Sequence, residues 1–453
     1  MTDRADALTR ELMSEISAWH EGEEEYLQAV EEVVRDVITV EKADSVYAGA
    51  RVLRRLAEPD RIVSFRVEWL DDKGDIQVNR GWRVQHSNLM GPYKGGLRFH
   101  PSVTRSVLKF LAFEQTFKNA LTDLPLGGGK GGADFDPSGR SDGEIMRFCQ
   151  AFMSELAHHI GPTRDVPAGD IGVGPREIGY LASAYKRITG QADGTLTGKT
   201  PCMGGSALRV EATGYGLVYF LCAMLARAGE EIEGKRVAVS GKGNVARHAA
   251  RKALKMGARV VSLSDSGGLL EAPDGFSAEA LDWIAQRADA GQSVESPPGR
   301  LGFSYRPGKK PWQMECDVAL PCATQNELDA DDARALADGG CRFVAEGANM
   351  PVTNDAAEIL ARAGILHAPG KAANAGGVAV SALEMRQNAA FRSMPAAEVD
   401  DLLRDIMVGI HRLICEEANR GTARSKADVD YPRGANVASY RRLARAVVDH
   451  GPR

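Results

Sequence analysis

The sequence lacks the features that mark membrane-spanning, disulfide-stabilised and nucleic-acid-binding chains. No apolar run reaches the roughly 20 residues that a membrane helix needs, and the longest near-candidate is residues 215–228. The seven cysteines include no CxxC pair and fit neither a zinc site nor a disulfide framework. No long Lys/Arg run occurs and the net charge is −5, so a basic nucleic-acid-binding protein is not supported.

The first ten residues are polar and mixed in charge, without the apolar stretch of a secretory signal peptide. Scattered thiols and no export signal favour a cytoplasmic protein, with neither membrane nor nucleic acid among its partners. Repeats and low-complexity tracts are also absent. With 43% hydrophobic and 26% charged residues, the 453-residue chain has the composition of a soluble globular protein of two or three domains.

One residue type is in excess. Glycine accounts for 49 of the 453 residues, about 11%, against about 7% in average proteins. The excess gathers in a few strings, and residues 81–132 hold nine of these glycines. Glycine permits positive φ and close approach of the backbone, so the strings predict places where backbone meets a ligand.

The first 205 residues predict an α/β domain. Helical spacing and strand-like alternation predict a helical region, two strands and two further helices, at residues 5–57, 61–69, 75–85, 102–121 and 141–159. Ser141 is the expected N-cap of the last helix, and Glu144 lies at the capping-box position.

From residue 206 to residue 379, strands alternate with helices, which predicts a doubly wound parallel sheet of the Rossmann type. The expected strands are short apolar runs at residues 236–240, 259–263, 318–320, 343–346 and 365–367. Residues 291–310, with the pair Pro297-Pro298 and several glycines, predict a loose linker. Helices from about residue 380 to residue 453 are expected to pack back against the first domain. The fold class is therefore α/β with two domains.

A GxGxxA string, with Gly241, Gly243 and Ala246, follows an expected strand and opens an expected helix. The glycines allow a tight turn and let a pyrophosphate approach the helix N-terminus, whose free N–H groups favour anions. Asp265 follows Gly241 by 24 residues, which is close to the spacing of a ribose-binding carboxylate. The pattern predicts a dinucleotide site.

The residues around Asp265 leave the choice of dinucleotide open. A carboxylate that bonds the ribose 2′-hydroxyl repels a 2′-phosphate and favours NAD. The neighbouring hydroxyls of Ser264 and Ser266 could instead bond a phosphate, with Arg287 as a possible cation.

Lys130 stands among five glycines in the string LPLGGGKGG. A Walker A loop needs Gly six residues before its lysine and Ser or Thr after it, but Leu124 and Gly131 hold these positions. A small ligand can reach such a lysine, and burial beside other cations would lower its pKa. A solvated lysine in a flexible loop is the alternative.

Three further polar positions accompany this lysine. Gln115 and Lys118 share one face of a predicted helix, and Asp170 lies in the Pro/Gly string DVPAGDIGVG. A carboxylate beside an activated lysine can move protons. Taken alone, these positions are more typical of a solvated helix face and a turn-forming aspartate.

Eight strings decide between these alternatives. GPYKGGLRFHPSV, LPLGGGKGGADFDP, DVPAGDIGVGPREIGY, EATGYG, SGKGNVA, LPCATQNEL, AEGANMP and APGKAANAGGVAVSALEM occur in this order. Together they resemble glutamate dehydrogenase of the small, homohexameric type in the Glu/Leu/Phe/Val dehydrogenase family, over essentially the whole chain. The resemblance implies reversible oxidative deamination of L-glutamate to 2-oxoglutarate and ammonium with NADP, for ammonium assimilation; the NAD-dependent form is the runner-up.

The resemblance also implies roles for single residues. Lys130 and Asp170 match the family's catalytic lysine and aspartate. The matching substrate-binding positions are Lys94 and Ser381 for the side-chain carboxylate, Lys118 for the α-carboxylate, and Gln115 and Gly169 nearby. The matching cofactor-binding positions are Thr213, Gly241, Gly243, Asn244, Val245, Asp265, Ser266 and Asn349. Residues 1–205 would bind substrate and form the oligomer, residues 206–379 would bind the dinucleotide, and no metal is expected.

Three positions depart from the family's pattern: Val210 stands where proline is usual, Lys242 where serine is common, and Val380 where threonine is common. None removes a catalytic group, and Lys242 adds a cation beside the phosphates. The string Ser-Asp-Ser around Asp265 resembles the NADP-dependent relatives more than the NAD-dependent ones.

Two rival functions make different demands on the sequence. A dehydrogenase of branched-chain or aromatic amino acids would need an apolar residue in place of Lys94, because its side-chain pocket holds no carboxylate. A catalytically inactive binding protein would be expected to have lost Lys130 or Asp170, and both are present.

Overall fold

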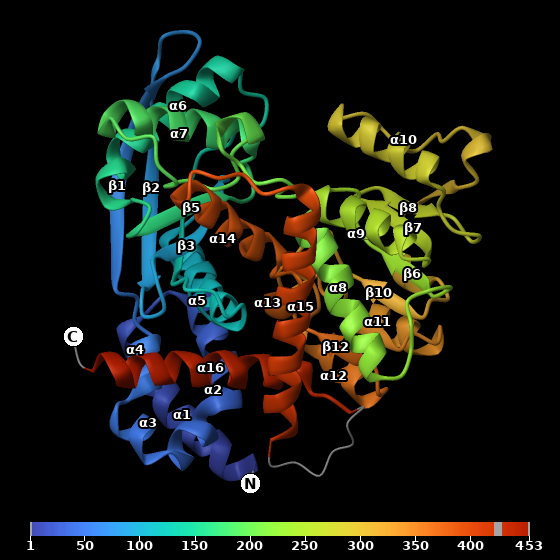
Figure 1. The fold of residues 1–453 in the computed structure, drawn as a ribbon. Helices are drawn as coiled ribbons and strands as arrows, with labels where there is room; N and C mark the ends of the chain where they lie inside the picture. The colour runs from blue at the N-terminus through green and yellow to red at the C-terminus, as the bar shows by residue number, and fades with distance from the viewer. Residues whose placement is uncertain (1, 421–427, 452–453) are drawn as a thin grey trace. The chain divides into compact units, whose positions relative to one another are not determined.

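The structure, a computed structural model, describes residues 2–420 and 428–451 (Figure 1). Two compact units make up the chain. Unit 1 comprises Met1–Arg209, Val380–Val399 and Asn436–Arg453, and unit 2 comprises Val210–Ala379 and Asp400–Ala435. None of the helices among the described residues combines the length and apolar character that crossing a membrane requires.

The boundary between the units falls within three carboxy-terminal helices, α14 (Gly376–Ala389), α15 (Ala396–Asn419) and α16 (Tyr431–His450). The sequence had predicted that residues 380–453 pack together on the first domain, but Asp400–Ala435 belongs to unit 2.

The reason lies in the contacts of α15 with α8 (Ala212–Arg227) inside unit 2. A Cβ atom on Gly216 would lie 3.3 Å from Met407 Sδ, and the rings of Phe220 and His411 meet edge-on at 5.4 Å. The apolar stripe of a helix predicts that it is packed, but it does not identify the partner.

Unit 1 is built on a five-stranded sheet in the order β1-β2-β4-β3-β5. Its strands are β1 (Arg61–Leu70), β2 (Ile76–Ser87), β3 (Tyr93–Phe99), β4 (Gly128–Ala133) and β5 (Asp165–Gly169). β2 pairs antiparallel with β1 and β4, whereas β3 pairs parallel with β4 and β5.

Seven helices accompany this sheet within residues 2–209. The region predicted as helical at residues 5–57 is divided into α1 (Thr2–Trp19), α2 (Glu24–Ala43), α3 (Ser45–Gly49) and α4 (Val52–Leu56). The others are α5 (Arg105–Leu121), which packs on β2 and β4, α6 (Asp142–Leu156) and α7 (Pro175–Thr189). The aromatic core includes Phe135 and Phe148, whose rings stack with centroids 3.8 Å apart.

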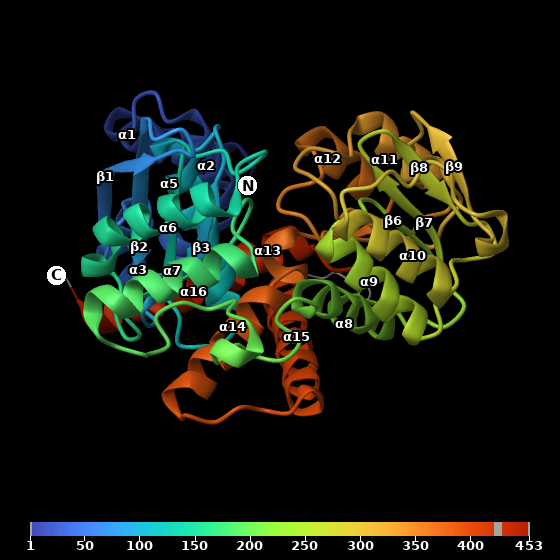
Figure 2. The same cartoon turned by 90° about the horizontal axis from the view of Figure 1, so that it is seen from above.

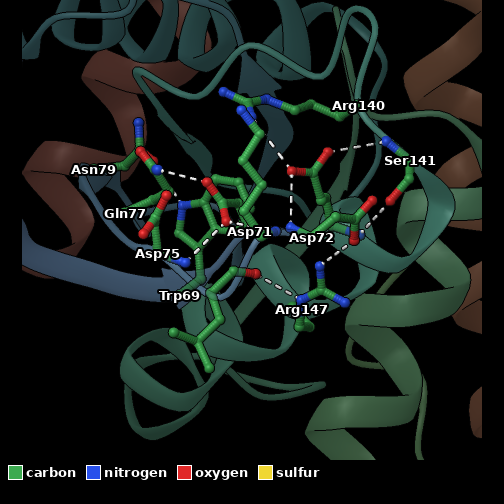
Figure 3. A network of polar contacts seen from close by, with 12 residues as sticks. Trp69, Asp71, Asp72, Asp75, Gln77, Asn79, Arg140, Ser141 and Arg147 are labelled. Atoms are coloured by element: carbon green, nitrogen blue, oxygen red, sulfur yellow. Dashed lines mark hydrogen bonds and ion pairs between the residues drawn. The ribbon is translucent and has the colours of Figure 1, made fainter.

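The turn between β1 and β2 is tied to α6 by a network of polar contacts (Figure 3). Arg147 donates to the carbonyl oxygen of Leu70 and to Asp72 Oδ1, both at 2.6 Å. Ser141 and Glu144 form the capping box that the sequence predicted at the start of α6. The network fixes the register of the hairpin against this helix.

The glycine-rich strings of unit 1 are strands, and the interpretation of the string around Lys130 as a loop was wrong. The strings form β3, β4 and β5, with β3 and β4 inside the sheet. A Cβ on Gly95 would lie 1.7 Å from the carbonyl oxygen of Gly129, and one on Gly128 would lie 1.9 Å from Thr116 Oγ1. These strands need glycine, yet glycine has low strand propensity, so sequence patterns conceal them.

A buried arginine crosses the space that these glycines leave. Arg83 of β2 donates from Nε and Nη2 to the two carboxylate oxygens of Asp165 on β5, at 2.9 and 2.5 Å, and from Nη1 to the carbonyl oxygen of Gly95 at 3.1 Å. Both charged side chains are fully buried. A Cβ on Gly131 would lie 3.0 Å from Arg83 Cδ. The ion pair therefore joins β2, β3 and β5 past the glycines of β4.

Unit 2 contains a seven-stranded sheet in the order β12-β11-β10-β6-β7-β8-β9. The strands are β6 (Arg236–Val239), β7 (Arg259–Asp265), β8 (Gly268–Glu271), β9 (Ser304–Pro307), β10 (Val318–Leu320), β11 (Phe343–Ala345) and β12 (Leu366–Ala368). The five predicted strands are present and parallel. The sheet is not parallel throughout, however, because β8 and β9 pair antiparallel, and β9 lies in the predicted linker.

Helices cover both faces of this sheet, as a doubly wound fold requires. Figure 2 shows α11 (Ala330–Asp338) and α12 (Asn354–Arg362) on one side, with α9 (Asn244–Lys255) and α10 (Ala278–Asp289) on the other. The short α13 (Gly370–Ala373) precedes α14.

We expect the Arg83–Asp165 pair to be the most sensitive charged contact of unit 1. Arg83→Met leaves a carboxylate buried without its cation, which costs about 3–5 kcal/mol of unfolding free energy. Arg147→Met, in a partly exposed pair with Asp72, is the matched control and costs at most about 1 kcal/mol. Urea unfolding measures both, and equal midpoints for the two variants would contradict this role for Arg83.

Candidate active site

Two residues that the resemblance made catalytic meet in unit 1. Lys130 lies in β4, and Asp170 directly follows β5. Lys130 Nζ lies 3.0 Å from Asp170 Oδ1, and the lysine is 4% exposed. The other carboxylate oxygen, Oδ2, accepts a hydrogen bond of 2.7 Å from Arg98 Nε on β3. The aspartate thus bridges two cations.

Lys94 of β3 is buried and donates from Nζ to Thr197 Oγ1 at 2.9 Å. The segment after Thr197 is tied to α14, because Glu384 accepts from the backbone N–H of Gly198 at 3.0 Å. Ser381 lies one helical turn before Glu384 and is buried as well. This tie connects the segment that contacts Lys94 with the helix that carries Ser381.

Lys118 and Gln115 lie on α5, which packs against β4. Both are half-buried. Gln115 donates to Asn119 Oδ1 at 2.7 Å, and Asn119 in turn donates to the backbone carbonyl of Lys94 at 3.2 Å. Gly169 ends β5 beside Asp170, and a Cβ there would lie 2.4 Å from the carbonyl oxygen of Val173.

The buried cations of unit 1 disfavour one another. Burial, followed by repulsion from Arg209 and Arg83, lowers the pKa of Lys94 well below its usual value. Burial and the nearby charge of Lys130 lower the pKa of Lys118 to about 8. The pKa of Lys130 is lowered chiefly by burial, against the opposing attraction of Asp170.

Asp170 shows the opposite balance. Burial alone would raise the pKa of its carboxyl, but Lys130 and Arg98 outweigh that effect and lower it to about 2. Asp170 also lines a cavity of about 410 Å³ that reaches the N-terminal end of α7 at Arg176 and Glu177. The arrangement holds a carboxylate that is ionised at neutral pH beside amines of weakened basicity. Such a set can bind anions and exchange protons.

The glycine-rich loop of unit 2 has the geometry of a dinucleotide site. Gly241 has a φ of +83°, which favours glycine, and a Cβ on it would lie 3.2 Å from Ala323. Nothing lies within 4 Å of the place that a Cβ on Gly243 would take, immediately before the N-terminus of α9. The backbone is therefore open to a ligand where the N–H groups of α9 are free. These residues fit the pyrophosphate of a dinucleotide.

Asp265, at the end of β7, is saturated by hydrogen-bond donors. Lys242 Nζ lies 2.8 Å from Oδ2, and the Tyr305 hydroxyl donates to Oδ1 at 3.0 Å. The backbone N–H groups of Gly267 and Gly268 donate to the same Oδ1, at 3.0 and 3.1 Å. The ammonium of Lys242 offsets the charge of this carboxylate, and Oδ1 already accepts three hydrogen bonds, so only Oδ2 can accept from a further donor.

The remaining predicted cofactor positions lie around the loop with different contacts. Asn244 Nδ2 donates to the carbonyl oxygen of Val210 at 2.7 Å, and Asn349 Oδ1 accepts from Asn374 at 3.0 Å. Thr213 lies in the first turn of α8. Two more stand at the loop edges: Val245, half-buried, and Ser266, exposed.

Arg287, considered as a cation for the site, is directed elsewhere. Its guanidinium lies over the Trp283 ring at 5.1 Å and donates to the carbonyl oxygen of Ser293.

Sequence reasoning missed several residues at these sites. Arg98 lies four residues after Lys94 in one strand, so alternation could have placed both on one face. Thr197 and Arg209 had no such signal; Arg209 is half-buried, with no hydrogen-bond partner for Nε among the described residues. Tyr305 reaches Asp265 only through the unpredicted pairing of β9 with β8.

The lowered pKa of Lys118 predicts how stability depends on pH. Between the folded pKa of about 8 and the unfolded value near 10.4, the unfolded chain binds the extra proton, so stability rises with pH. We expect the free energy of unfolding of Lys118→Met to rise less between pH 8 and pH 10 than that of the unmodified chain. Urea unfolding at both values measures this, with exposed Lys73→Met as control; slopes unchanged in Lys118→Met would contradict it.

Two family models match this chain. The model described as Glutamate/Leucine/Phenylalanine/Valine dehydrogenase matches residues 204–451, and its dimerisation-domain model matches residues 59–187. The chain is 52% identical over 428 residues to the NADP-specific glutamate dehydrogenase of Salmonella typhimurium, which covers 94% of this chain and 95% of that one. It is 50% identical over 442 residues to the NAD-specific glutamate dehydrogenase of Bacteroides fragilis, covering 97% and 98%.

A solved structure resembles the whole fold. That of Plasmodium falciparum glutamate dehydrogenase superposes with a TM-score of 0.94 at 45% identity and covers 99% of this chain and 96% of that one. The likeness confirms the predicted α/β fold class. Full-length similarity to these relatives, together with both family models, means that the chain belongs to the Glu/Leu/Phe/Val dehydrogenase family.

Proposed function

We propose that this chain is an NADP-dependent glutamate dehydrogenase, which interconverts L-glutamate with 2-oxoglutarate and ammonium and serves ammonium assimilation in the cytoplasm. The observation that carries the proposal is the meeting of Lys130 and Asp170 beside two more lysines of lowered pKa. The names of the relatives from Salmonella typhimurium and Plasmodium falciparum support it.

A dicarboxylate substrate suits the charges of unit 1. In this proposal Lys94 and Ser381 bind the side-chain carboxylate, while Lys118 binds the α-carboxylate with Gln115 and the backbone at Gly169 nearby. Several cations crowded together raise the free energy of the empty site, so an anion with two charges is favoured over one with a single charge. Arg209 adds a further cation close to Lys94 and Lys118.

Lys130 and Asp170 divide the proton transfers. Because burial lowers the pKa of Lys130, its neutral amine can take a proton from an attacking water and, once protonated, polarise the substrate's oxygen. Asp170, ionised in the resting site, accepts a proton from the amine and returns it in the reverse direction. NADP, when bound, supplies the hydride acceptor.

The residues of unit 2 fit NADP better than NAD. Gly241, Gly243, Asn244 and Val245 would hold the pyrophosphate at the N-terminus of α9, and Thr213 and Asn349 would neighbour the nicotinamide. The choice of cofactor rests on the residues and not on overall sequence identity, because the chain is 52% identical to an NADP-specific relative and 50% identical to an NAD-specific one.

The surroundings of Asp265 support the choice of NADP. Lys242 neutralises the carboxylate that would otherwise repel a 2′-phosphate. Its ammonium and the exposed Ser266 hydroxyl can both bond that phosphate.

The units divide the work, with unit 1 binding substrate and forming the oligomer, and unit 2 binding the cofactor. β1 is an edge strand of its sheet, and three apolar side chains of the β1–β2 hairpin are 49% to 72% exposed: Leu70, Ile76 and Val78. An edge strand with an exposed apolar face favours self-association. We therefore include a homohexamer in the proposal; light scattering that gives the mass of one chain would contradict it.

Lys94→Leu tests the substrate. Initial rates with 2-oxoglutarate, ammonium and NADPH should be readily measurable in the unmodified chain, and no turnover with either NADPH or NADH would overturn the proposed enzyme. Losing a charged contact of about 1.5–3 kcal/mol should lower kcat/KM for glutamate about 10- to 150-fold in Lys94→Leu. Relative activity on apolar amino acids should rise.

Two further variants serve as comparisons for Lys94→Leu, one that removes the proposed catalytic lysine and one on the surface. Lys130→Met should lose about 10²–10⁴-fold in kcat with unchanged circular dichroism, because it removes the proton-transfer group. Lys73→Leu, at the exposed β1–β2 turn, should keep normal rates. Unchanged substrate selectivity in Lys94→Leu would count against a carboxylate at that position.

Lys242→Ser tests the cofactor. Without the ammonium, Asp265 is left anionic where the 2′-phosphate binds, so the Kd for NADPH should rise about 10-fold while that for NADH stays equal or falls. Tryptophan fluorescence titration measures both constants without turnover. Lys255→Ser, at the exposed far end of α9, is the control. Equal changes for both cofactors would show that Lys242 does not discriminate between them.

A further inference from the structure

The carboxylate of Asp170 has a second cationic partner that the proposed mechanism does not use. Arg98 Nε donates to Asp170 Oδ2 at 2.7 Å, while Lys130 Nζ lies 3.0 Å from Oδ1. Each oxygen is therefore held by a different cation. The side chains of Arg98 and Asp170 are only 16% and 17% exposed, so water screens the contact weakly.

We propose that Arg98 is a positioning residue that turns the Asp170 carboxylate so that one oxygen faces Lys130, and that it keeps the proton of the pair mobile. This inference rests on the proposed function, because it assigns Lys130 and Asp170 the proton transfers of that reaction. Arg98 acts through Asp170, and we assign it no contact with the reacting atoms.

The sheet fixes the three side chains relative to one another. Arg98 of β3 pairs in register with Gly132 of β4, two residues after Lys130, so Arg98 and Lys130 lie on one face. On the other side, β3 pairs with β5 up to the pair of Leu97 with Gly169, so Arg98 stands level with Asp170.

A glycine makes the approach of Asp170 to β3 possible. A Cβ on Gly96 would lie 2.9 Å from Asp170 Cβ, so a larger residue there would push the carboxylate away. The position of Asp170 between Arg98 and Lys130 is therefore a property of the sheet itself.

Two cations on one carboxylate give a different proton balance from a simple ion pair. With Lys130 alone, both oxygens could turn to the ammonium and hold its proton. Arg98 occupies Oδ2 and repels the ammonium, an effect that adds to burial in lowering the pKa of Lys130. The other charges that face Lys130 are Arg83 on β2 and Lys118 on α5.

The first test is the pH profile of kcat/KM. Loss of Arg98 removes a repelling charge, so the pKa of Lys130 rises and the form with a deprotonated lysine is reached at higher pH. In Arg98→Met the acid limb should move up by about one pH unit, with kcat about 10- to 100-fold lower and KM for glutamate within about threefold. Arg98→Lys, which keeps the charge, should return the limb most of the way.

The second test needs no turnover. The rate at which acetic anhydride acylates Lys130, followed by peptide mass spectrometry across pH 7 to 10, reports the same protonation in the free protein. Arg80→Met is the matched control, because Arg80 pairs with Asp134 but is itself 73% exposed. Its acylation curve should coincide with that of the unmodified chain, whereas the Arg98→Met curve should shift to higher pH.

The two tests separate the inference from the proposed function. An unmodified chain without dehydrogenase activity would overturn the function, while the acylation curves would still report on the coupling of Arg98 to Lys130. Coincident curves for Arg98→Met and the unmodified chain would overturn the inference. So would an Arg98→Lys variant whose KM for glutamate rises with an unmoved pH profile, because Arg98 would then contact the substrate. If Arg98→Met does not fold, Arg98→Gln takes its place in both measurements.

Discussion

The Arg83–Asp165 ion pair is the constraint on which the rest of unit 1 depends. Two charges held out of water are stable only while their mutual geometry is kept, so β2, β3 and β5 cannot slide past one another without a large cost in free energy. The Arg83 side chain has room to pass β4 because glycine stands at position 131, where a Cβ would lie 3.0 Å from Arg83 Cδ. Lys130 lies on the strand that the pair crosses, and Asp170 lies five residues beyond Asp165. The relative positions of Lys130 and Asp170 thus depend on the Arg83–Asp165 ion pair, which itself takes no part in the proposed reaction.

The cluster of positive side chains in unit 1 suits an anionic ligand. Lys94, Lys118, Lys130 and Arg209 repel one another, while the carboxylate of Asp170 attracts Lys118 and Lys130, and those of Glu384 and Asp165 attract Lys94. Such an arrangement is less stable empty than filled, which is how binding sites for multiply charged anions are commonly built. In unit 2 the opposite arrangement occurs, because Lys242 and Tyr305 surround a single carboxylate, that of Asp265, and the ammonium of Lys242 offsets its negative charge.

The sequence was informative wherever a local rule governs structure. The Ser141 capping box and the GxGxxA turn follow from side-chain chemistry over a few residues. The sequence was uninformative where the structure of a segment depends on residues far away in the chain. β4 is a strand only because backbone and arginine atoms fill the space beside its glycines, and β9 is a strand only because β8 lies next to it. The partners of Asp170 and Asp265 come from such long-range pairing, so the sequence could propose candidate site residues but not their contacts.

The glycines of β3 and β4 have a consequence for how this protein can change over generations. At Gly95, Gly128 and Gly132, an added methyl group would come within about 2.1 Å of a neighbouring atom, whatever its chemical character. At Gly95 and Gly132 a smaller neighbouring side chain cannot make room for a larger residue, because the nearest atom at both positions belongs to the main chain. Under the proposed function, lineages would alter substrate or cofactor preference through side chains such as Lys94 and Lys242. The glycines of β3 and β4, which support these side chains, are expected to change very little.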